Sequence, residues 1–322
     1  MRFKIPPVTL TELVKKAPML LGGSNLVSSN YIKIIAKDNL ITLQACNDCA
    51  GIVIRGVAEV YEEGEVGVLG KVLDGLAPQI TAGQVTFDLE GGRMVLRAGK
   101  AKFSLGIIDP DTFLRAPDFN YIEMHPIDDF FALYSQVSHC ASSDENNPSK
   151  SSVLLRSSSV ACTDGRRVGI YYRPLPFPQP IVVQVKYLNL LKRVFKSEAT
   201  YVGQLDSHIC FRQGHVDAYI RLVSKPYYNI DSAIPNDAYD EARIGKHELL
   251  ASLKNAKVVL KEDEASTLKV QFRSNEMHLS VESALGQMQD IVQCSFYKDF
   301  DFLVNLDMFL DAIKKLRGEE VV

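Results

Sequence analysis

The chain repeats parts of its own sequence at a spacing of more than one hundred residues. Residues 45–48 and 51–55, Ala-Cys-Asn-Asp and Gly-Ile-Val-Ile-Arg, return at 161–164 and 169–173 as Ala-Cys-Thr-Asp and Gly-Ile-Tyr-Tyr-Arg. The copies lie 116 to 118 positions apart. This period is too long for the roughly 20- to 50-residue units of a solenoid and is typical of whole small domains in tandem. Such a chain usually builds a curved or closed object, so the repeat bears directly on function.

A third copy follows at the same spacing. Leu13, Phe131 and Leu249 each stand in a segment with helical spacing of apolar residues, and each is 118 positions from the next. In every copy strand-like runs and a second helical segment follow the first. The sequence therefore predicts an α+β fold of three tandem domains, residues 1–120, 121–240 and 241–322. Each domain would pack two helices on antiparallel sheets.

Apolar spacing and turn residues locate the expected elements. The expected helices span residues 9–17, 71–77, 128–139, 185–196, 245–253 and 306–316. The expected strands span residues 31–36, 40–45, 51–55, 85–89, 93–97, 100–105, 153–155, 159–162, 168–173, 200–205, 208–212, 215–222, 267–272, 277–281 and 289–296. The first two domains end in a meander of hairpins that has no counterpart in the third. We therefore expect the functional protein to carry roughly 35–45 further residues that complete the third domain.

Composition excludes several classes of protein. The chain has 322 residues, a net charge of −3 and no apolar stretch long enough to span a membrane. Its N-terminus lacks the apolar core of a signal peptide, so we expect a cytoplasmic protein. Most of its six cysteines stand in apolar runs, which favours reduced core thiols over disulfides. Cys46 and Cys49 form a lone CxxC, for which we favour a structural role over metal or redox chemistry. No cofactor or metal is expected.

Basic residues gather on the polar faces of the expected helices, whereas acidic residues gather in loops. A single lysine on a helix is most simply a solvated side chain. The same basic face on several repeated helices instead indicates a surface for phosphate groups. The DNA-binding candidates are Lys15, Lys16, Lys71, Lys186, Lys192, Arg193, Lys196, Lys254, Lys314, Lys315 and Arg317.

An enzyme is the competing class of protein. The sequence has no glycine-rich phosphate loop, no GxSxG, no HExxH and no pair of carboxylates around a histidine. His139 and Cys140 are the one neighbouring histidine–cysteine pair. Because adjacent residues of a helix point about 100° apart, we expect that these two side chains do not face each other. We therefore expect no catalytic residues.

Three segments resemble the bacterial β sliding clamp, the processivity subunit of the replicative DNA polymerase III. They are residues 160–168 (Val-Ala-Cys-Thr-Asp-Gly-Arg-Arg-Val), 92–105 and 302–312. The resemblance extends along the whole chain, and three repeated domains are also the family's architecture. The chain departs from the family at Ser24, where relatives have an arginine, and at Pro148 and Ser149, where aromatic residues are common. Such differences suit a divergent or phage-encoded member.

The resemblance implies a ring-shaped head-to-tail homodimer that encircles duplex DNA without reading its sequence. The implied partners are the replicative polymerase, the clamp loader and other proteins with a clamp-binding motif. They would insert a peptide into a cleft between domains two and three, at Lys150, Thr163, Gly165, Arg166, Arg167, Val168, Pro235, Asn305 and Met308. The implied dimer interface brings the edge strand with Phe103 to a third-domain edge near Val258, Val259 and Leu260. The alternative is a clamp-like scaffold or decoy that binds replication proteins without encircling DNA.

Overall fold

The structure is a computed structural model of the chain. It describes residues 1–17, 21–22, 24–81, 83–195, 199–205, 207–234, 240–260 and 266–322. The chain forms two compact units. The first unit comprises residues 1–134, 143–160 and 172–227, and the second comprises residues 135–142, 161–171 and 228–322.

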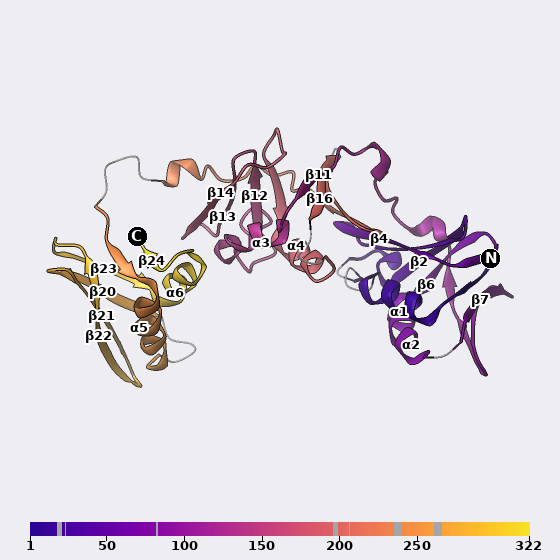
Figure 1. The fold of residues 1–322 in the computed structure, drawn as a ribbon, viewed down its shortest axis with the longest axis horizontal. Helices are drawn as coiled ribbons and strands as arrows, with labels where there is room; N and C mark the ends of the chain where they lie inside the picture. The colour runs from indigo at the N-terminus through magenta and orange to yellow at the C-terminus, as the bar shows by residue number, and fades with distance from the viewer. Residues whose placement is uncertain are drawn as a thin grey trace. The chain divides into compact units, whose positions relative to one another are not determined.

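The same four-stranded arrangement occurs three times along the chain (Figure 1). In the first copy the strands are β2 (Tyr31–Lys37), β3 (Leu40–Cys46), β4 (Ala50–Val57) and β6 (Gly64–Leu69), in the order β6-β2-β3-β4. The second copy has β12 (Ser152–Arg156), β13 (Ser159–Thr163), β14 (Val168–Tyr172) and β15 (Ile181–Gln184), in the order β15-β12-β13-β14. The third has β20 (Thr267–Arg273), β21 (Glu276–Ser283), β22 (Gly286–Ser295) and β23 (Phe300–Asn305), in the order β23-β20-β21-β22. This shared order is the structural counterpart of the sequence repeat.

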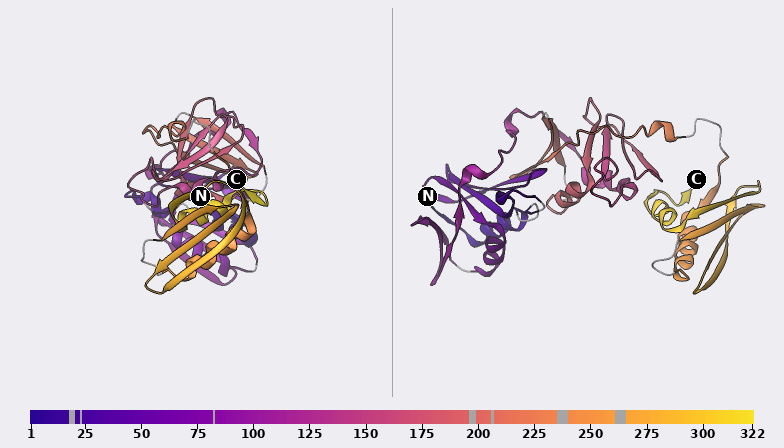
Figure 2. Two further views of the ribbon diagram at one scale, coloured as in Figure 1. Left: turned by 90° about the vertical axis from the view of Figure 1, so that its left-hand side faces the viewer. Right: turned by 180° about the vertical axis from the view of Figure 1, so that it is seen from behind.

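Each copy also has a helix before its first strand and a helix directly after its fourth. The helices are α1 (Pro7–Lys16), α2 (Gly70–Leu76), α3 (Phe130–Ser135), α4 (Val185–Lys192), α5 (Lys246–Val258) and α6 (Leu306–Lys315). A polar contact joins the two helices of each copy: Thr11 donates to the carbonyl of Ala77 at 3.2 Å, Tyr134 to Asn189 at 2.8 Å, and Lys257 to Asp307 at 2.5 Å. Figures 1 and 2 show α5 and α6 side by side next to their sheet. The six expected helices are therefore present.

Two helices are shorter than expected. The segment 128–139 forms only α3, which begins after Asp129 with its φ of 52° and ends at Ser135, and a separate 3-10 turn at Ser138–Cys140. The helix expected to reach residue 196 ends at Lys192, and Arg193 caps it. Further 3-10 turns occupy Val27–Asn30, Ala77–Gln79, Pro110–Thr112, Phe119–Tyr121 and Asp231–Ala233.

The expected closing meanders are present in the first two copies. β1 (Arg2–Ile5), β5 (Glu59–Glu62), β7 (Val85–Glu90), β8 (Arg93–Ala98) and β9 (Ala101–Leu105) form a sheet in the order β5-β1-β7-β8-β9. The turn between β7 and β8 places Gly91 and Gly92 at φ of 55° and 73°, the positive values that a tight hairpin turn requires. The second copy has β11 (His125–Ile127), β16 (Thr200–Leu205), β17 (His208–Gln213) and β18 (Val216–Arg221). In the described part of the third copy, the corresponding strands are β19 (Arg243–Gly245) and β24 (Glu320–Val321).

Sheet pairing joins the first copy to the second within the first compact unit. With β10 (Ile107–Ile108) at one end, nine strands run in the order β10-β6-β2-β3-β4-β18-β17-β16-β11. The junction is the antiparallel pair β4–β18, in which Gly51 lies opposite Tyr219. A Cβ atom at position 51 would lie 2.3 Å from the ring carbon Cζ of Tyr219. Glycine is therefore required there, because the tyrosine ring packs directly over the partner backbone.

A buried carboxylate fastens the same junction. The side chain of Asp217 on β18 is 1% exposed. Its oxygens accept from Arg55 Nη1 on β4 at 2.6 Å and from Arg212 Nε on β17 at 2.6 Å. The hydrogen bonds to Asp217 raise the pKa of Arg212. One carboxylate thus ties three neighbouring strands together.

We predict that Asp217→Asn lowers the free energy of unfolding by roughly 1–3 kcal/mol, because it removes the charge from the acceptor of three guanidinium hydrogen bonds and leaves both guanidinium groups without their counter-charge. Urea denaturation followed by circular dichroism measures the change. Asp74→Asn, on the exposed face of α2, is the matched control. Equal stability of the two variants would contradict the role given to Asp217.

Candidate partner-peptide and nucleic-acid surfaces

A closed turn follows β13 in the second compact unit. The hydroxyl of Thr163 donates to the carbonyl of Arg167 at 2.7 Å and accepts from the N–H of Gly165 at 3.0 Å. The Asp164 carboxylate accepts the N–H groups of Arg166 and Arg167 at 2.9 and 3.1 Å. Burial opposes ionisation of Asp164, but these hydrogen bonds and the Arg167 guanidinium outweigh it and lower its pKa. The structure thus brings the predicted cleft residues 163–167 together in one rigid turn.

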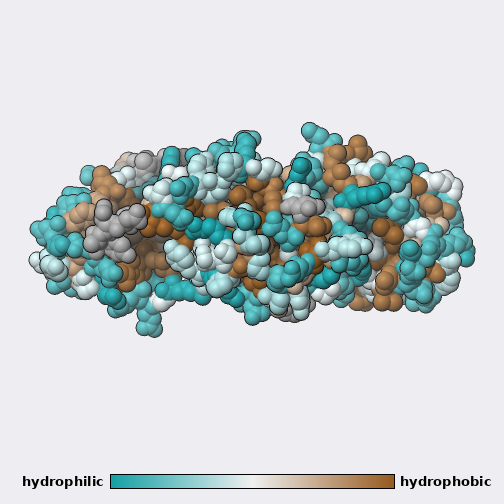
Figure 3. Space-filling view, turned by 90° about the horizontal axis from the view of Figure 1, so that it is seen from above, coloured by the Kyte–Doolittle hydropathy of each residue, from teal (hydrophilic) through white to brown (hydrophobic). Residues whose placement is uncertain are grey.

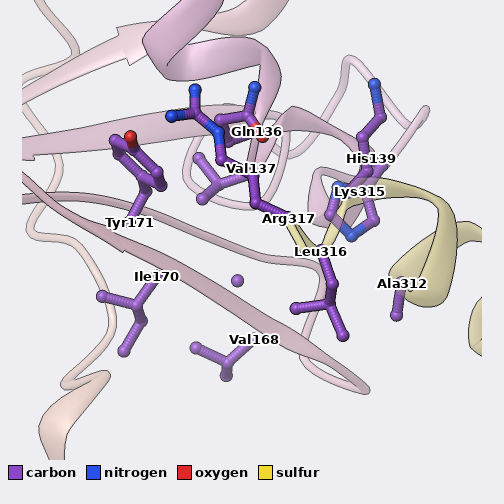
Figure 4. A pocket seen from close by; sticks show the side chains of 11 residues that line it. Gln136, Val137, His139, Val168, Ile170, Tyr171, Ala312, Lys315, Leu316 and Arg317 are labelled. Atoms are coloured by element: carbon purple, nitrogen blue, oxygen red, sulfur yellow. The ribbon is translucent and has the colours of Figure 1, made fainter. Parts of the chain in front are cut away.

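A pocket of about 330 Å³ opens beside this turn (Figure 4). Three segments of the second unit line it: residues 136–139, the strand β14 and the C-terminal end of α6. Apolar side chains form most of its wall, and two cations lie at its rim. The lining residues are Gln136, Val137, His139, Val168, Gly169, Ile170, Tyr171, Ala312, Lys315, Leu316 and Arg317.

The electrostatics of this pocket favour an anionic ligand. The Arg317 guanidinium lies 5.1 Å from the centre of the Tyr171 ring, and both side chains line the pocket (Figure 4). Arg167 reaches Asp164 at 3.2 Å and Asp311 of α6 at 3.9 Å. Burial, and then the charges of Arg167 and Lys315, lower the pKa of His139. An apolar wall with a cationic rim suits a peptide that carries an apolar anchor and a carboxylate.

The histidine–cysteine pair in this pocket differs from expectation. Cys140 Sγ lies 3.4 Å from His139 Nε2, so the prediction that the two side chains do not face each other is wrong. The reason is that they belong to a 3-10 turn and not to an α-helix. Burial raises the pKa of Cys140 to about 11, while the pKa of His139 is lowered. Both groups are therefore neutral near pH 7, and the pair lacks the thiolate that a nucleophile requires.

Of the other predicted cleft residues, those that the structure describes are not among the residues that line this pocket. Asn305 caps the N-terminus of α6 by accepting from the N–H of Met308 at 2.9 Å, and so stands at the far end of that helix from the pocket. Lys150 belongs to the first unit, in the turn before β12. Pro235 lies outside the described residues. Of the predicted cleft, Val168 lines the pocket. Val137, Ile170 and Leu316 were missed, because short apolar segments at three distant places carry no common signal in the sequence.

Most of the predicted DNA-binding residues that the structure describes lie on helices, and Arg193 and Arg317 lie just beyond the ends of α4 and α6. Lys15, Lys71, Lys192, Arg193, Lys254, Lys314, Lys315 and Arg317 are exposed, and Lys16 is half-buried. Lys186 is engaged already, by Glu145 at 2.8 Å and by the Tyr187 ring at 4.9 Å. Lys196 lies outside the described residues. Several of these lysines stand in the last turn of a helix, where the helix dipole alone favours a cation.

Of the predicted dimer residues, Phe103 lies on an edge strand, whereas residues 258–260 lie at the end of a helix. Phe103 lies on β9, the last strand of its sheet, as expected of an edge. Val258 ends α5 and Val259 caps it, so these residues are not themselves strand residues. They lie near β22, because the Val259 carbonyl accepts from Ser283 at the turn between β21 and β22, and β22 pairs with β19 at Cys294 and Ser295. The predicted interface remains a prediction.

Exposed apolar side chains are interspersed with polar ones on the face that Figure 3 shows. Hydropathy on this face therefore marks no single binding surface.

All six cysteines are free, and no three His, Cys, Asp or Glu side chains in the described ranges are grouped to hold a metal. Of the helices that the structure describes, none has the length and apolarity needed to cross a bilayer.

Comparison with solved structures identifies the fold. The DNA polymerase sliding clamp of Bacillus subtilis superimposes with a TM-score of 0.91 over 99% of this chain and 91% of that one, at 19% identity. The chain has the sliding-clamp fold. The sliding clamp of Caulobacter crescentus gives a TM-score of 0.91 at 15% identity, over 99% of this chain and 91% of the clamp. The DNA polymerase III β subunit of Thermotoga maritima gives 0.83 at 18% identity, with the same coverage of 99% and 91%.

Sequence comparison agrees with this assignment. The β sliding clamp of B. subtilis is 21% identical over 350 aligned positions, which cover 100% of this chain and 92% of the relative. No known family model matches the chain. The resemblance to bacterial β sliding clamps and the expected α+β class are therefore confirmed, with the sliding-clamp fold extending over the whole chain.

The lowered pKa of His139 predicts how stability depends on pH. The ordinary value is 6.5, so below that pH the unfolded chain takes up a proton that the folded chain resists. Stability should therefore fall from about pH 7.5 to about pH 5.5, and it should fall less in His139→Gln. Thermal unfolding at each pH measures this. His247→Gln, at an exposed position on α5, is the control. An equal decrease in His139→Gln and the parent would contradict the burial of a neutral imidazole.

Proposed function

We propose that the protein is a DNA sliding clamp, a non-catalytic processivity factor that encircles duplex DNA and tethers the replicative polymerase. The observation that carries this proposal is the sliding-clamp fold over the whole chain, with one strand order repeated three times. We assign the repeats to domains 1–120, 121–240 and 241–322. Two chains joined head to tail would then form a ring of six domains. A closed ring cannot leave DNA without opening, so it stays on the duplex without needing tight contacts to it.

The β4–β18 pair supports this way of closing a ring. An edge strand of the second copy pairs there with the last strand of the first copy's four-stranded sheet. In the described chain, β9 ends one sheet, and β22 pairs on its outer side only at Cys294 and Ser295. We propose that β9 of one chain pairs with β22 of another by the same antiparallel rule. Phe103 and residues 258–260 would then close the apolar part of that interface.

The inner surface would hold DNA through diffuse charge. The exposed basic helix residues can attract phosphates, whereas recognition of base edges would need specific contacts that hinder sliding. Lys15, Lys71, Lys192, Arg193, Lys254, Lys314, Lys315 and Arg317 are candidates because each is exposed. Lys186 contributes less, since Glu145 already neutralises it.

We predict that Lys71→Glu with Arg193→Glu weakens binding to duplex DNA, because two cations that neutralise phosphates are replaced by anions. The slope of log affinity against log salt should fall by about 0.9 for each phosphate that the variant no longer neutralises. Fluorescence anisotropy across a salt series measures both quantities. Light scattering should give twice 35.8 kDa for parent and variant alike, because these substitutions lie outside the proposed interface.

Lys37→Glu with Lys269→Glu is the matched control, with the same change of charge on strands β2 and β20. This pair should keep the salt slope of the parent. Equal weakening in both double variants would indicate a response to net charge and not a basic helix surface. A parent protein that remains monomeric at micromolar concentration would favour the alternative, a scaffold that does not encircle DNA.

We also propose that the turn 163–167, the adjacent pocket and the first turn of α6 together bind short peptides of replication proteins. The apolar wall would take one or two large apolar side chains, and Lys315 and Arg317 would pair with a carboxylate. Lys150, Asn305 and Met308 are proposed as the outer part of the same cleft.

We predict that Val168→Ala and Met308→Ala each weaken peptide binding by about 1 kcal/mol, roughly fivefold, since few apolar anchors carry most of the affinity of a peptide groove. Fluorescence polarisation with a labelled C-terminal peptide of a replicative polymerase measures this. Val8→Ala, 71% exposed on α1, is the control. If Val168→Ala alone weakens binding, the cleft is the pocket and does not extend to the start of α6. Unchanged affinity in both would place the cleft elsewhere.

A further inference from the structure

One cation of the proposed DNA-binding surface is already held by a carboxylate of the same chain. The Lys186 ammonium group lies 2.8 Å from the Glu145 carboxylate. Lys186 stands in the first turn of α4, and Glu145 stands in the loop that precedes β12. Both residues belong to the first compact unit. Their side chains are 36% and 61% exposed, so other anions can reach the pair from solvent.

The neighbouring tyrosine fixes the position of this lysine. The Lys186 ammonium group lies 4.9 Å from the centre of the Tyr187 ring, which is buried. Burial, and then a hydrogen bond with Cys49 in the turn between β3 and β4, raise the pKa of Tyr187. The ring therefore stays neutral and anchored between the first two copies, and it holds the ammonium group beside it.

Lys186 stands where a cation is unfavourable unless an anion lies nearby. Other candidate lysines, such as Lys15 and Lys192, stand in the last turn of a helix, where the negative end of the helix dipole favours them. The first turn of α4 is the positive end of its dipole. An anion beside Lys186 is therefore attracted by two positive charges. In the structure this anion is Glu145, and on DNA a phosphate group would compete for the same place.

The loop that carries Glu145 is held by local hydrogen bonds. The Asp144 carboxylate accepts the N–H of Asn146 at 3.0 Å, and the Asp144 carbonyl accepts the N–H of Asn147 at 3.2 Å. The Asn147 carbonyl in turn accepts the N–H of Ser151 at 3.0 Å. These bonds keep the Glu145 carboxylate beside α4 without depending on the ion pair alone.

We propose that Glu145 limits the strength of DNA binding by competing with a DNA phosphate group for Lys186. The inference rests on the proposed function, because it concerns the same basic helix surface. An exposed ion pair is worth little, so a phosphate group can displace the carboxylate. The loop then keeps the displaced carboxylate close by, where it repels that phosphate. Glu145 thus weakens one contact of a surface whose contacts have to stay reversible for the protein to slide.

The test uses the full 322-residue chain and a fluorescein-labelled DNA duplex, with anisotropy measured across a salt series. Glu145→Gln keeps the size of the side chain and removes its charge. At low salt it should bind the duplex roughly fivefold more tightly than the parent, which is the effect of one charge pair in water. The slope of log affinity against log salt should become steeper by about 0.9, as for one more neutralised phosphate.

Glu123→Gln is the matched control. Glu123 is 87% exposed and lies 3.6 Å from His125, so its substitution removes the same charge without freeing a helix lysine. This variant should bind DNA as the parent does. Thermal unfolding of every variant checks that the fold is kept.

A double-mutant cycle separates competition for Lys186 from a general change of charge. Lys186→Gln alone should alter DNA affinity little, because Glu145 already neutralises this cation. Combined with Glu145→Gln, it should abolish the gain in affinity and restore the salt slope of the parent.

Three results would overturn the inference while leaving the proposed function in place. They are salt-dependent DNA binding by the parent that Glu145→Gln leaves unchanged, a gain in Glu145→Gln that persists without Lys186, and an equal gain in Glu123→Gln. Absence of duplex binding by both the parent and Glu145→Gln would instead overturn the proposed function together with this inference.

Discussion

The backbone N–H and C=O groups on the outer side of every edge strand need hydrogen-bond partners, and the pairing of the sheets in this structure follows from that need. A backbone N–H or C=O that is buried without a partner costs as much as a missing hydrogen bond. The chain meets this cost at β4 by pairing it with β18 of the next copy, which turns two sheets into one of nine strands. The same requirement at β9 and β22 motivates the proposed ring. One physical rule thus underlies a junction inside the chain and a proposed contact between chains.

The helices pack one face against the sheets and carry basic residues on the other face. Each pair buries one face against its sheet, as Leu10, Leu13 and Val14 do on α1. Each pair is also fixed by one polar contact between its members, such as the hydrogen bond from Tyr134 to Asn189. The faces left outside carry the lysines. Because the sheets hold the chain together, these outer helix faces are free to carry charge without weakening the packing of the core.

The sequence predicted those parts of the fold that repeat with a clear period. The helix register through Leu13, Phe131 and Leu249 and the hairpins around Gly91 and Gly92 are present in the structure. The strands β6, β15 and β23 were missed, and they share one physical cause. Each passes into a helix at the very next residue, so no intervening loop separates the two periods. Apolar residues continue across the boundary, and a reading by periodicity assigns them to the helix or to neither element.

The site was harder to predict for a related reason. The turn 163–167 was recognised because its residues are contiguous, whereas the pocket beside it gathers side chains from segments near positions 137, 170 and 316. Only the folded chain brings these together. His139 and Cys140 show the limit of helical geometry as a guide. The expectation assumed an α-helix, but the helix ends at Ser135 and His139 and Cys140 belong to a separate 3-10 turn.

Asp217 shows how the junction between copies keeps its register. In β18 it lies opposite Val53 of β4 and opposite Arg212 of β17, with Arg55 on the same face two residues along. A slip of one residue between β4 and β18 would put Asp217 and Arg55 on opposite faces of the sheet and leave the Arg55 guanidinium without its partner, whereas Arg212 would stay beside Asp217 in the β17–β18 hairpin. Hydrophobic pairing alone specifies register weakly where a strand is apolar on both faces, as β18 is from Val216 to Ile220. The buried carboxylate therefore makes the alternative alignment costly, and it fixes the register in which the first two copies pair.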